Sequence, residues 1–390
     1  MLHNATDSEF HETIDATIFR MPYQFDDFSK KMNKKPENDD KKGLCSESSR
    51  PYLLYQNTLK RRIGPLTSNV TVKMGNTRIF FTSDVHGSDV CFIKFINAAK
   101  FYEANVLVLG GDVTGKMMVP IVEQPDGTAV AEFLGTRQVM KTRDDRVLLE
   151  RRIRNLGHYP YSTTQSEVER LQTDKELVES LFTRVMIEGV KRWDAMAENR
   201  LKGSDVKCYI SPGNDDRFDI DQVLQSSSTL IYPENEVVLI DEKYEMITCG
   251  WTNFTPWHSP RECSEDEVAR RIEAMTQKVQ HMEKCIFNLH CPPHNTPIDL
   301  APELDPTQKP VVKGGRVNVI HVGSTAVRRA IETCKPVLGL HGHIHESRGF
   351  VKIGRTLCIN PGSEYGEGIL HGALINLDQK GVKSYMLTQG

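Results

Sequence analysis

Short apolar runs recur along the chain, and each one ends in glycine or in polar residues. The run Val106–Leu109 has four consecutive apolar residues, a pattern typical of a strand that is buried on both faces. Segments with apolar residues at helical spacing, such as 90–102, lie between these runs. This alternation predicts an α/β protein with parallel central strands. We expect strands at 78–81, 106–109, 206–211, 285–289, 337–340 and 356–359, and two closing strands within 371–387.

Residues 116–165 interrupt this alternation and predict an inserted hairpin and helix. Apolar segments at 117–123 and 128–134 flank the turn sequence Gln-Pro-Asp-Gly. A helix is expected at 142–156, where arginines and acidic residues are interleaved. The leading interpretation is an exposed, salt-bridged face. The alternative is a lid whose arginines meet an anionic substrate, because the insertion starts directly after a polar strand end.

The first 50 residues differ in character from the rest of the chain. Residues 29–42 are mostly Lys, Asn, Asp, Glu and Pro, and such a segment buries too little apolar surface to offset its ordering entropy. We interpret 1–50 as an arm followed by a charged, partly disordered linker, and 51–390 as the main domain. Residues 14–28 carry scattered apolar side chains. They form either an arm that docks on a neighbouring subunit, giving a homo-oligomer, or a floppy tail.

Side chains with metal-ligand chemistry follow several of the predicted strands. Because the carboxyl ends of parallel strands meet at one edge of a sheet, we expect these groups to cluster there. Clustered carboxylates and imidazoles repel or desolvate one another unless cations hold them together. Imidazole with carboxylate and amide oxygens suits Mn, Fe or Zn. The candidate ligands are Asp84, His86, Asp112, Asn214, His290, His343 and His345.

The motifs Asp-Val-His at 84–86, Gly-Gly-Asp at 110–112, Gly-Asn-Asp at 213–215 and Gly-His-Ile-His at 342–345, with His290, resemble the calcineurin-like metallophosphoesterase superfamily over about residues 76–380. The resemblance implies a four-layer α/β/β/α sandwich and a site for two divalent metal ions, Mn foremost, with Fe, Zn or Ni as alternatives. It assigns Asp84, His86 and His345 to one ion. It assigns Asn214, His290 and His343 to the other, with Asp112 as the catalytic bridge.

Asp215 is the one departure from that pattern. The superfamily commonly has a His at this position, which contacts the phosphate and protonates the leaving group. We expect Asp215 to orient His343 or His290 instead, because a carboxylate beside two cations does not hold a proton. The candidates to protonate the leaving group in its place are His341, His294 and His258.

The resemblance implies in-line attack on a phosphoryl group by a hydroxide that bridges the two ions. The missing His points toward phosphodiesters: a nucleotide, a cyclic nucleotide or a nucleic-acid-like substrate. The alternative is a phosphomonoesterase acting on a small metabolite, a nucleotide or a protein. A non-catalytic scaffold of the same fold is disfavoured, because a scaffold gains nothing from a full ligand set.

Composition and charge limit the binding partners and the cellular compartment that we expect for this protein. The net charge is −3, so charge does not indicate nucleic acid or a membrane surface, although nucleic acid stays open as a substrate. The sequence has no run of 18 apolar residues, so we expect no membrane-spanning helix, and no secretory signal is visible. Nine cysteines without paired spacing favour a reducing cytosol. Residues 251–258 hold two tryptophans, Trp251 and Trp257, which we interpret as packing or, alternatively, as a wall that stacks a nucleobase.

Overall fold

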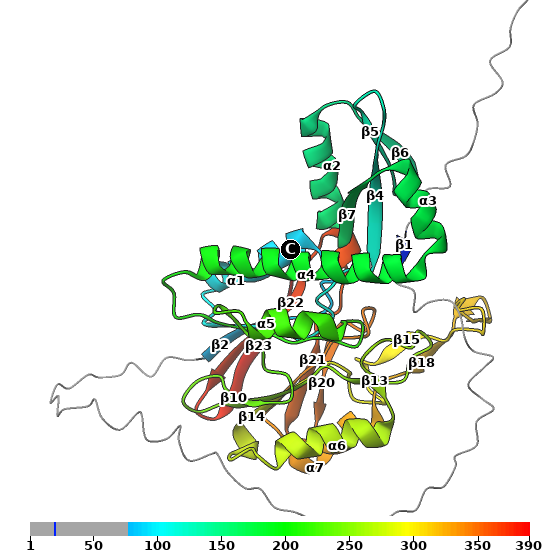
Figure 1. Ribbon diagram of the computed structural model, residues 1–390. Coiled ribbons are helices and arrows are strands. Elements are labelled where there is room, and N and C mark those ends of the chain that lie inside the picture. Colours follow the sequence, from blue (N-terminus) through cyan, green and yellow to red (C-terminus); the bar gives the residue numbers. More distant parts are fainter. Residues whose placement is uncertain (1–18, 21–76) are drawn as a thin grey trace, which may run out of the picture. The chain divides into compact units, whose positions relative to one another are not determined.

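The computed structural model describes residues 19–20 and 77–390. The remainder of the predicted arm and linker at 1–50 lies outside the described residues. So does the basic sequence Lys60-Arg61-Arg62. Figure 1 shows the described residues as a coloured ribbon.

The first sheet contains three of the strands whose polar ends were predicted to bind metal. Its parallel strands are β2 (Thr77–Thr82), β3 (Val106–Leu109), β8 (Lys207–Ile210) and β9 (Leu230–Ile231). The antiparallel strands β22 (His371–Asp378) and β23 (Gly381–Gln389) extend the sheet beyond β2. Helices α1 (Asp89–Phe101) and α4 (Lys175–Leu201) connect the parallel strands. The short helix α5 (Asp221–Gln225) precedes β9.

The second sheet contains the other two metal-motif strands. Its parallel strands are β11 (Glu245–Cys249), β14 (Cys285–Leu289), β19 (Leu338–Leu340) and β21 (Thr356–Asn360). Antiparallel strands close its two edges, β10 (Val237–Leu239) and β20 (Gly349–Ile353). Helices α6 (Glu265–Thr276) and α7 (Thr325–Cys334) precede β14 and β19. The α/β class predicted from the sequence is confirmed.

The two sheets pack face to face, and helices cover their outer faces. Ile79 and Phe81 of β2 belong to the core cluster between the sheets, whereas Phe80 belongs to the cluster formed with α1 and α4. In the second sheet Ile286 faces the other sheet, and Phe287 packs toward α6 and α7. Successive side chains of a strand point to opposite faces, so burial on both faces requires an unbroken apolar run. This is the physical origin of the apolar runs in the sequence.

The insertion has more strands than the sequence indicated. It contains β4 (Met117–Glu123), β5 (Ala129–Phe133), β6 (Thr136–Met140), α2 (Arg143–Asn155), β7 (His158–Thr163) and α3 (Gln165–Thr173). The expected hairpin and helix are present, but β6 and β7 were not predicted. Strand β4 pairs with β5 and, in parallel, with β7, and this small sheet has its own core with α2.

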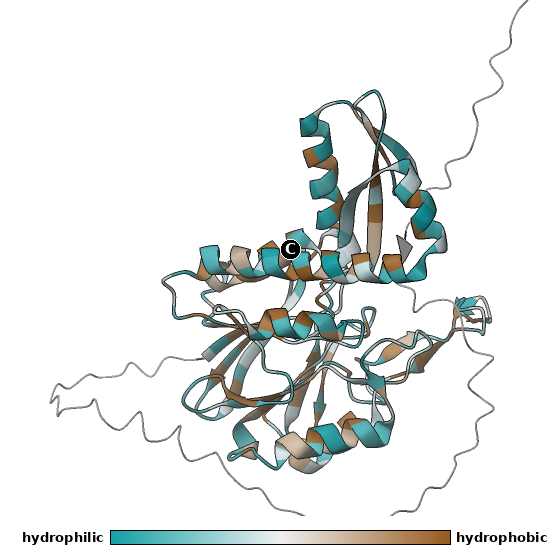
Figure 2. Ribbon diagram, in the orientation of Figure 1, coloured by the Kyte–Doolittle hydropathy of each residue, from teal (hydrophilic) through white to brown (hydrophobic). Residues whose placement is uncertain are grey.

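Helix α2 has the salt-bridged character that was expected. It is mostly hydrophilic (Figure 2). Arg146 contacts Glu123 and Glu150, and Arg154 contacts Glu150 and Asp89. Paired arginines on an exposed face are a sufficient account of this helix.

Two residues of the predicted N-terminal arm are described. They form β1 (Phe19–Arg20), whose backbone pairs antiparallel with β4 of the insertion. The described part of the arm therefore extends a sheet of its own chain.

Smaller elements project from the second sheet. Strands β12 (Thr252–Asn253) and β13 (Glu262–Cys263) pair at the two ends of an aromatic loop. Strands β15 (Leu300–Pro302) and β18 (Val319–His321) form a ribbon extended by β16 (Val312–Lys313) and β17 (Arg316–Val317). Among the described residues, no helix is both long and apolar enough to cross a bilayer. The cysteines of the described part are free thiols, and most are buried.

The packing between the sheets yields a stability prediction. Leu377 of β22 is fully buried between them, whereas the side chain of Leu239 is 61% exposed. Leu377→Ala should lower the free energy of unfolding by about 2–5 kcal/mol, because it removes buried methyl groups and leaves a cavity. The matched change Leu239→Ala should cost less than about 1 kcal/mol. Urea unfolding of both variants checks this, and equal midpoints would contradict the assignment of the inter-sheet core.

Candidate metal centre

The predicted ligands lie together at the carboxyl ends of the strands from both sheets. Asp84 and His86 follow β2, and Asp112 follows β3. His345 comes from the loop after β19 in the other sheet. One ligand atom from each of these four residues lies within 4.8 Å of the others. Side chains far apart in the sequence therefore form one compact cluster of carboxylates and imidazoles.

The other three candidate ligands adjoin this cluster. Nε2 of His290 lies 3.5 Å from Oδ1 of Asp112 and 3.8 Å from Oδ1 of Asp84. The ring centroids of His290 and His343 are 5.5 Å apart. Asn214 lines the same pocket as Asp112, His343 and His345. The structure thus brings all seven predicted side chains together, and their roles as ligands stay predictions.

The backbone of the cluster adopts conformations that non-glycine residues rarely take. The φ angles are +56° at Asp84, +40° at His86, +50° at Asp112 and +68° at His343. The left-handed region is disfavoured for residues with a Cβ and concentrates at functional sites. A Cβ at Gly111 would lie 2.2 Å from Nδ1 of His290. Glycine before Asp112 is therefore needed for the close approach of the two strand ends.

Buried donor atoms without partners test whether metal ions fit. Oδ1 of Asn214 and Nε2 of His290 are buried and have no hydrogen-bond partner in the described part of the chain. Nδ1 of His290 contacts the Gly110 carbonyl at 3.0 Å, which leaves Nε2 free to accept a cation. Leaving such atoms unsatisfied costs free energy. Divalent cations satisfy them, so the residues present fit a metal centre.

The two central carboxylates have different electrostatic environments. Burial alone would raise the pKa of Asp84, but hydrogen bonding to His345 and the charge of His290 hold it well below its usual range. Burial and the neighbouring Asp215 raise the pKa of Asp112 to about 6. The backbone N–H of His343 donates to Asp84 at 3.0 Å. Asp112 is the carboxylate that is least compensated by the protein, which suits a position between two cations.

No model of a protein family matches the chain. It is 32% identical over 152 residues to the uncharacterized protein MJ1162 of Methanocaldococcus jannaschii, an alignment that covers 38% of this chain and 61% of that one. The chain therefore spans less than two thirds of this relative's length.

Solved structures resemble the chain over most of its length. One covers 81% of this chain and 99% of its own, with 14% identity and a TM-score of 0.51. A novel archaeal phosphodiesterase covers 80% of this chain and 100% of its own, with 12% identity and a TM-score of 0.32. A dimetal phosphatase from Danio rerio covers 80% and 98%, with 8% identity and a TM-score of 0.37.

The chain has the calcineurin-like metallophosphoesterase fold. The described strands place every motif of the resemblance at the carboxyl ends of strands, around the candidate metal centre. Only the fold follows from these likenesses, because the sequence identities are low.

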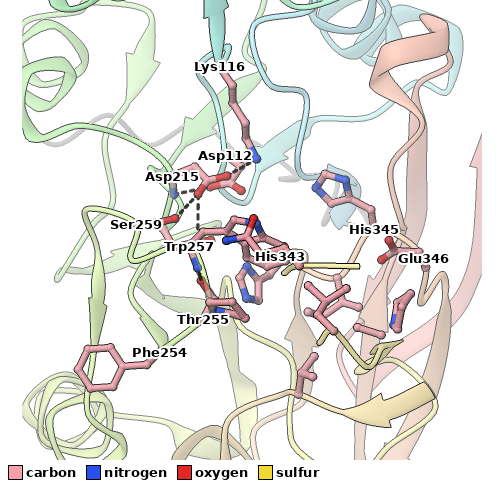
Figure 3. Close-up of a pocket in the computed structure, with 18 of the residues that line it drawn as sticks. Asp112, Lys116, Asp215, Phe254, Thr255, Trp257, Ser259, His343, His345 and Glu346 are labelled. Carbon is pink, nitrogen blue, oxygen red and sulfur yellow. Dashed lines mark hydrogen bonds and ion pairs between the residues drawn. The ribbon is translucent and has the colours of Figure 1, made fainter. Parts of the chain in front are cut away.

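Within this metallophosphoesterase fold, Asp215 has different partners from those expected. Its carboxylate pairs with the ammonium group of Lys116 and accepts a hydrogen bond from the Ser259 hydroxyl (Figure 3). Among the described residues it makes no hydrogen bond to His343 or His290 and accepts one instead from the side-chain amide of Asn214 at 3.1 Å, so the expected orienting role stays a prediction. Burial would raise the pKa of Asp215, but the charge of Lys116 holds it well below its usual range. Burial would lower the pKa of Lys116, and Asp215 raises it instead.

His341 and His258, which were proposed to protonate the leaving group, lie in different environments. His341 is fully buried, and its Nδ1 contacts the carbonyl oxygens of Leu289 and Cys291 at 2.8 and 3.1 Å. Burial lowers its pKa to about 4. His341 does not line the pocket and is buried in the core, so the structure does not bring it to the candidate site, and its catalytic role stays a prediction. His258 is exposed, on the aromatic loop between the pocket residues Trp257 and Ser259.

A cavity of about 860 Å³ opens above the metal centre. One wall is the aromatic loop 254–260, and another is the ribbon of β15 and β18. The insertion contributes Lys116, Met117 and His158, but no arginine of α2 lines the cavity. The sequence analysis did not identify Lys116, Ser259 and Tyr365 as pocket residues. The ring centroid of Tyr365 lies 4.6 Å from that of His86. No local pattern marks these residues, because each reaches the site through tertiary packing.

Asp216, also missed, connects two of the ligand loops. Its carboxylate is fully buried and accepts hydrogen bonds from the backbone N–H groups of Val113 (2.9 Å), Thr114 (2.8 Å) and Gly213 (2.8 Å). It thereby holds the loop after Asp112 against the loop that carries Asn214. Its position directly after the Gly-Asn-Asp motif was the available signal.

We predict that Asp216→Asn lowers the affinity for Mn²⁺ by about tenfold or more. The amide keeps the shape of the side chain but offers one acceptor oxygen instead of two, and loss of groups that orient ligands typically costs 10- to 100-fold in affinity. Isothermal titration with Mn²⁺ measures the change. Asp219→Asn is the matched control, because the side chain of Asp219 is 49% exposed. Affinity equal to that of the wild type, with the fold intact, would refute the connecting role.

Proposed function

We propose that this protein is a metal-dependent phosphodiesterase. The observation that carries the proposal is the convergence of the seven candidate ligands, four of which line one pocket, with Asp215 at the sequence position where the superfamily commonly has a His and Lys116 paired with it. The fold supports a phosphoesterase in general, and the pocket's own residues support the preference for diesters.

Two divalent cations are the implied cofactors. Asp84, His86 and His345 would hold one, Asn214, His290 and His343 the other, and Asp112 would serve both. Bound there, they would lower the pKa of a coordinated water and offset charge on the phosphoryl oxygens. Mn²⁺ is the ion we propose, since imidazole with carboxylate and amide oxygens suits it. A scaffold role is disfavoured, because buried donors such as Asn214 Oδ1 would cost free energy without a ligand.

Lys116 supplies the cationic group of the protein itself. Its side chain is 34% exposed, lines the pocket and reaches Asp215 beside Asp112. Because Asp215 raises the pKa of Lys116, the ammonium stays charged at neutral pH. A fixed positive charge at this position attracts the phosphoryl oxygens of a substrate and stabilises charge that develops on them.

The charges around the pocket favour diesters over monoesters. The carboxylates of Asp215, Glu303 and Glu346 line it. Asp215 and Glu303 are paired with Lys116 and Lys313, whereas Glu346 has no ion pair in the described part of the chain. A monoester carries up to two negative charges at neutral pH and a diester carries one, so repulsion by Glu346 penalises the monoester more. The insertion covers one side of this pocket through Lys116, Met117 and His158, and we infer that it acts as a cap over the bound ester.

The function is tested by adding Mn²⁺ to metal-free protein. We expect hydrolysis of bis-p-nitrophenyl phosphate with kcat/KM at least tenfold above that for p-nitrophenyl phosphate, because the two share a leaving group and differ in charge. Excess chelator should abolish both activities. Faster hydrolysis of the monoester would favour the phosphomonoesterase alternative, and full activity in metal-free protein would exclude the metal-dependent mechanism.

The role of Lys116 is tested by Lys116→Met. We expect kcat/KM for the diester to fall by about tenfold or more with Mn²⁺ content unchanged, because removal of a preorganised electrostatic contact typically costs at least that much. Lys141→Met, on the exposed surface of the insertion, is the matched control.

A double variant separates direct contact from neutralisation of Asp215. If Lys116 acts on the substrate, Lys116→Met with Asp215→Asn stays impaired. Asp215→Asn alone should keep its metals and most of its activity. Recovery of the double variant would mean that Lys116 serves only to neutralise Asp215.

A further inference from the structure

The cavity above the metal centre is larger than a phosphoryl group requires. Its volume of about 860 Å³ falls in the range of ~300–1,000 Å³ that is typical of pockets for drug-sized ligands. Most of its lining residues belong to two walls that contribute no candidate metal ligand. The walls are the aromatic loop 254–260 and the ribbon residues 301–322.

The aromatic loop presents rings to the cavity and is held in place by its own hydrogen bonds. Trp257 is 39% exposed and Phe254 is 63% exposed, and both line the pocket. The backbone N–H of Trp257 donates to the Thr255 hydroxyl at 3.2 Å, and the N–H of Thr255 donates to Glu262 at 3.0 Å. Phe254 points away from the labelled candidate ligands (Figure 3).

The other tryptophans have structural partners. Trp251 stacks on the Arg271 guanidinium at 3.9 Å, and Trp193 stacks on Phe92 at 4.2 Å. These contacts account for their positions in the fold. A pocket-lining tryptophan with a substantial exposed surface calls for a different account, because exposed large apolar groups commonly mark binding sites.

The opposite wall is apolar and rigidly attached. The lining side chains of the ribbon are mostly aliphatic: Ala301, Pro302, Leu304, Pro310, Ile320 and Val322. The buried carboxylate of Asp299 fixes the base of the ribbon, since it accepts from Gly323 N–H at 3.1 Å and lies 2.8 Å from Nδ1 of His321. The amide of Asn253 donates to the Val322 carbonyl at 3.1 Å, which ties the two walls together. Their separation is therefore set by the fold.

We propose that the space between these walls binds the nucleoside part of a phosphodiester substrate, with its base stacked on Trp257. The proposal rests on the proposed phosphodiesterase function and specifies its substrate class. Every nucleobase has a planar π-face, so any of them can stack on an indole ring. Gln308, Glu303 and Glu346 also line the cavity and offer hydrogen-bonding partners to base edges and ribose hydroxyls. An acyl chain would make no hydrogen bond with Gln308 or Glu346, and the Glu303 carboxylate already pairs with Lys313.

Two diesters with the same leaving group test the proposal in the Mn²⁺-loaded enzyme. The p-nitrophenyl ester of thymidine 5′-phosphate should have kcat/KM at least tenfold above methyl p-nitrophenyl phosphate. Trp257→Ala should remove most of this preference by raising KM for the thymidine ester, with little effect on the methyl ester. Trp257→Phe should keep most of it. Phe101→Ala is the control, because Phe101 is 78% exposed and does not line the cavity.

A binding measurement separates this proposal from the proposed function. Thymidine should quench tryptophan fluorescence of the metal-free protein, and Trp257→Phe should lose the quenching. Quenching without turnover of any diester would support the nucleoside site and refute the phosphodiesterase. Absence of both quenching and thymidine preference would overturn the nucleoside site. A preference for octyl p-nitrophenyl phosphate over the thymidine ester would also overturn it, in favour of an acyl chain.

Discussion

Buried negative charge where the two sheets meet is the constraint on which the site depends. Asp84 and Asp112 are almost completely buried, and backbone N–H groups offset only part of their charge. The surrounding imidazoles leave buried nitrogen atoms unpartnered. Isolated buried charges are costly unless they are paired or bind cations. The left-handed backbone at four ligand positions adds strain, which persists because strands of two sheets fix both sides of the cluster.

Sequence reasoning found this centre because its signals are local. An unbroken apolar run predicts a strand buried on both faces, and the residue that ends it lies at the sheet edge. The insertion was harder to predict. Thr136–Met140 has no clear apolar alternation, and His158–Thr163 contains Pro160. Proline argues against a strand, and here pairing with β4 overrides that preference.

The position of His341 outside the pocket could have been predicted from the sequence. Leu338 and Leu340 of β19 face the other sheet, so the alternation of the strand directs Gly339 and His341 to the opposite face. A Cβ at Gly339 would lie 2.7 Å from Nε2 of His341, which places the ring in the core rather than in the pocket. His343 escapes this alternation because its φ angle is +68°. A Cβ at the preceding Gly342 would lie 2.1 Å from Oγ of Ser83, and such a close approach between loops is not visible in a hydrophobic pattern.

Asp215 and the insertion are best understood together. A carboxylate at a position that faces a bound anion is unfavourable by itself. The chain compensates with Lys116, the first residue of the insertion, whose ammonium pairs with Asp215. The backbone N–H of Asp215 meanwhile donates to Asp112 at 3.0 Å, so this residue also helps to hold the central carboxylate. Asp215 and the inserted segment are therefore coupled features of one site. An account of either alone leaves the charge of Asp215 or of Lys116 without its partner.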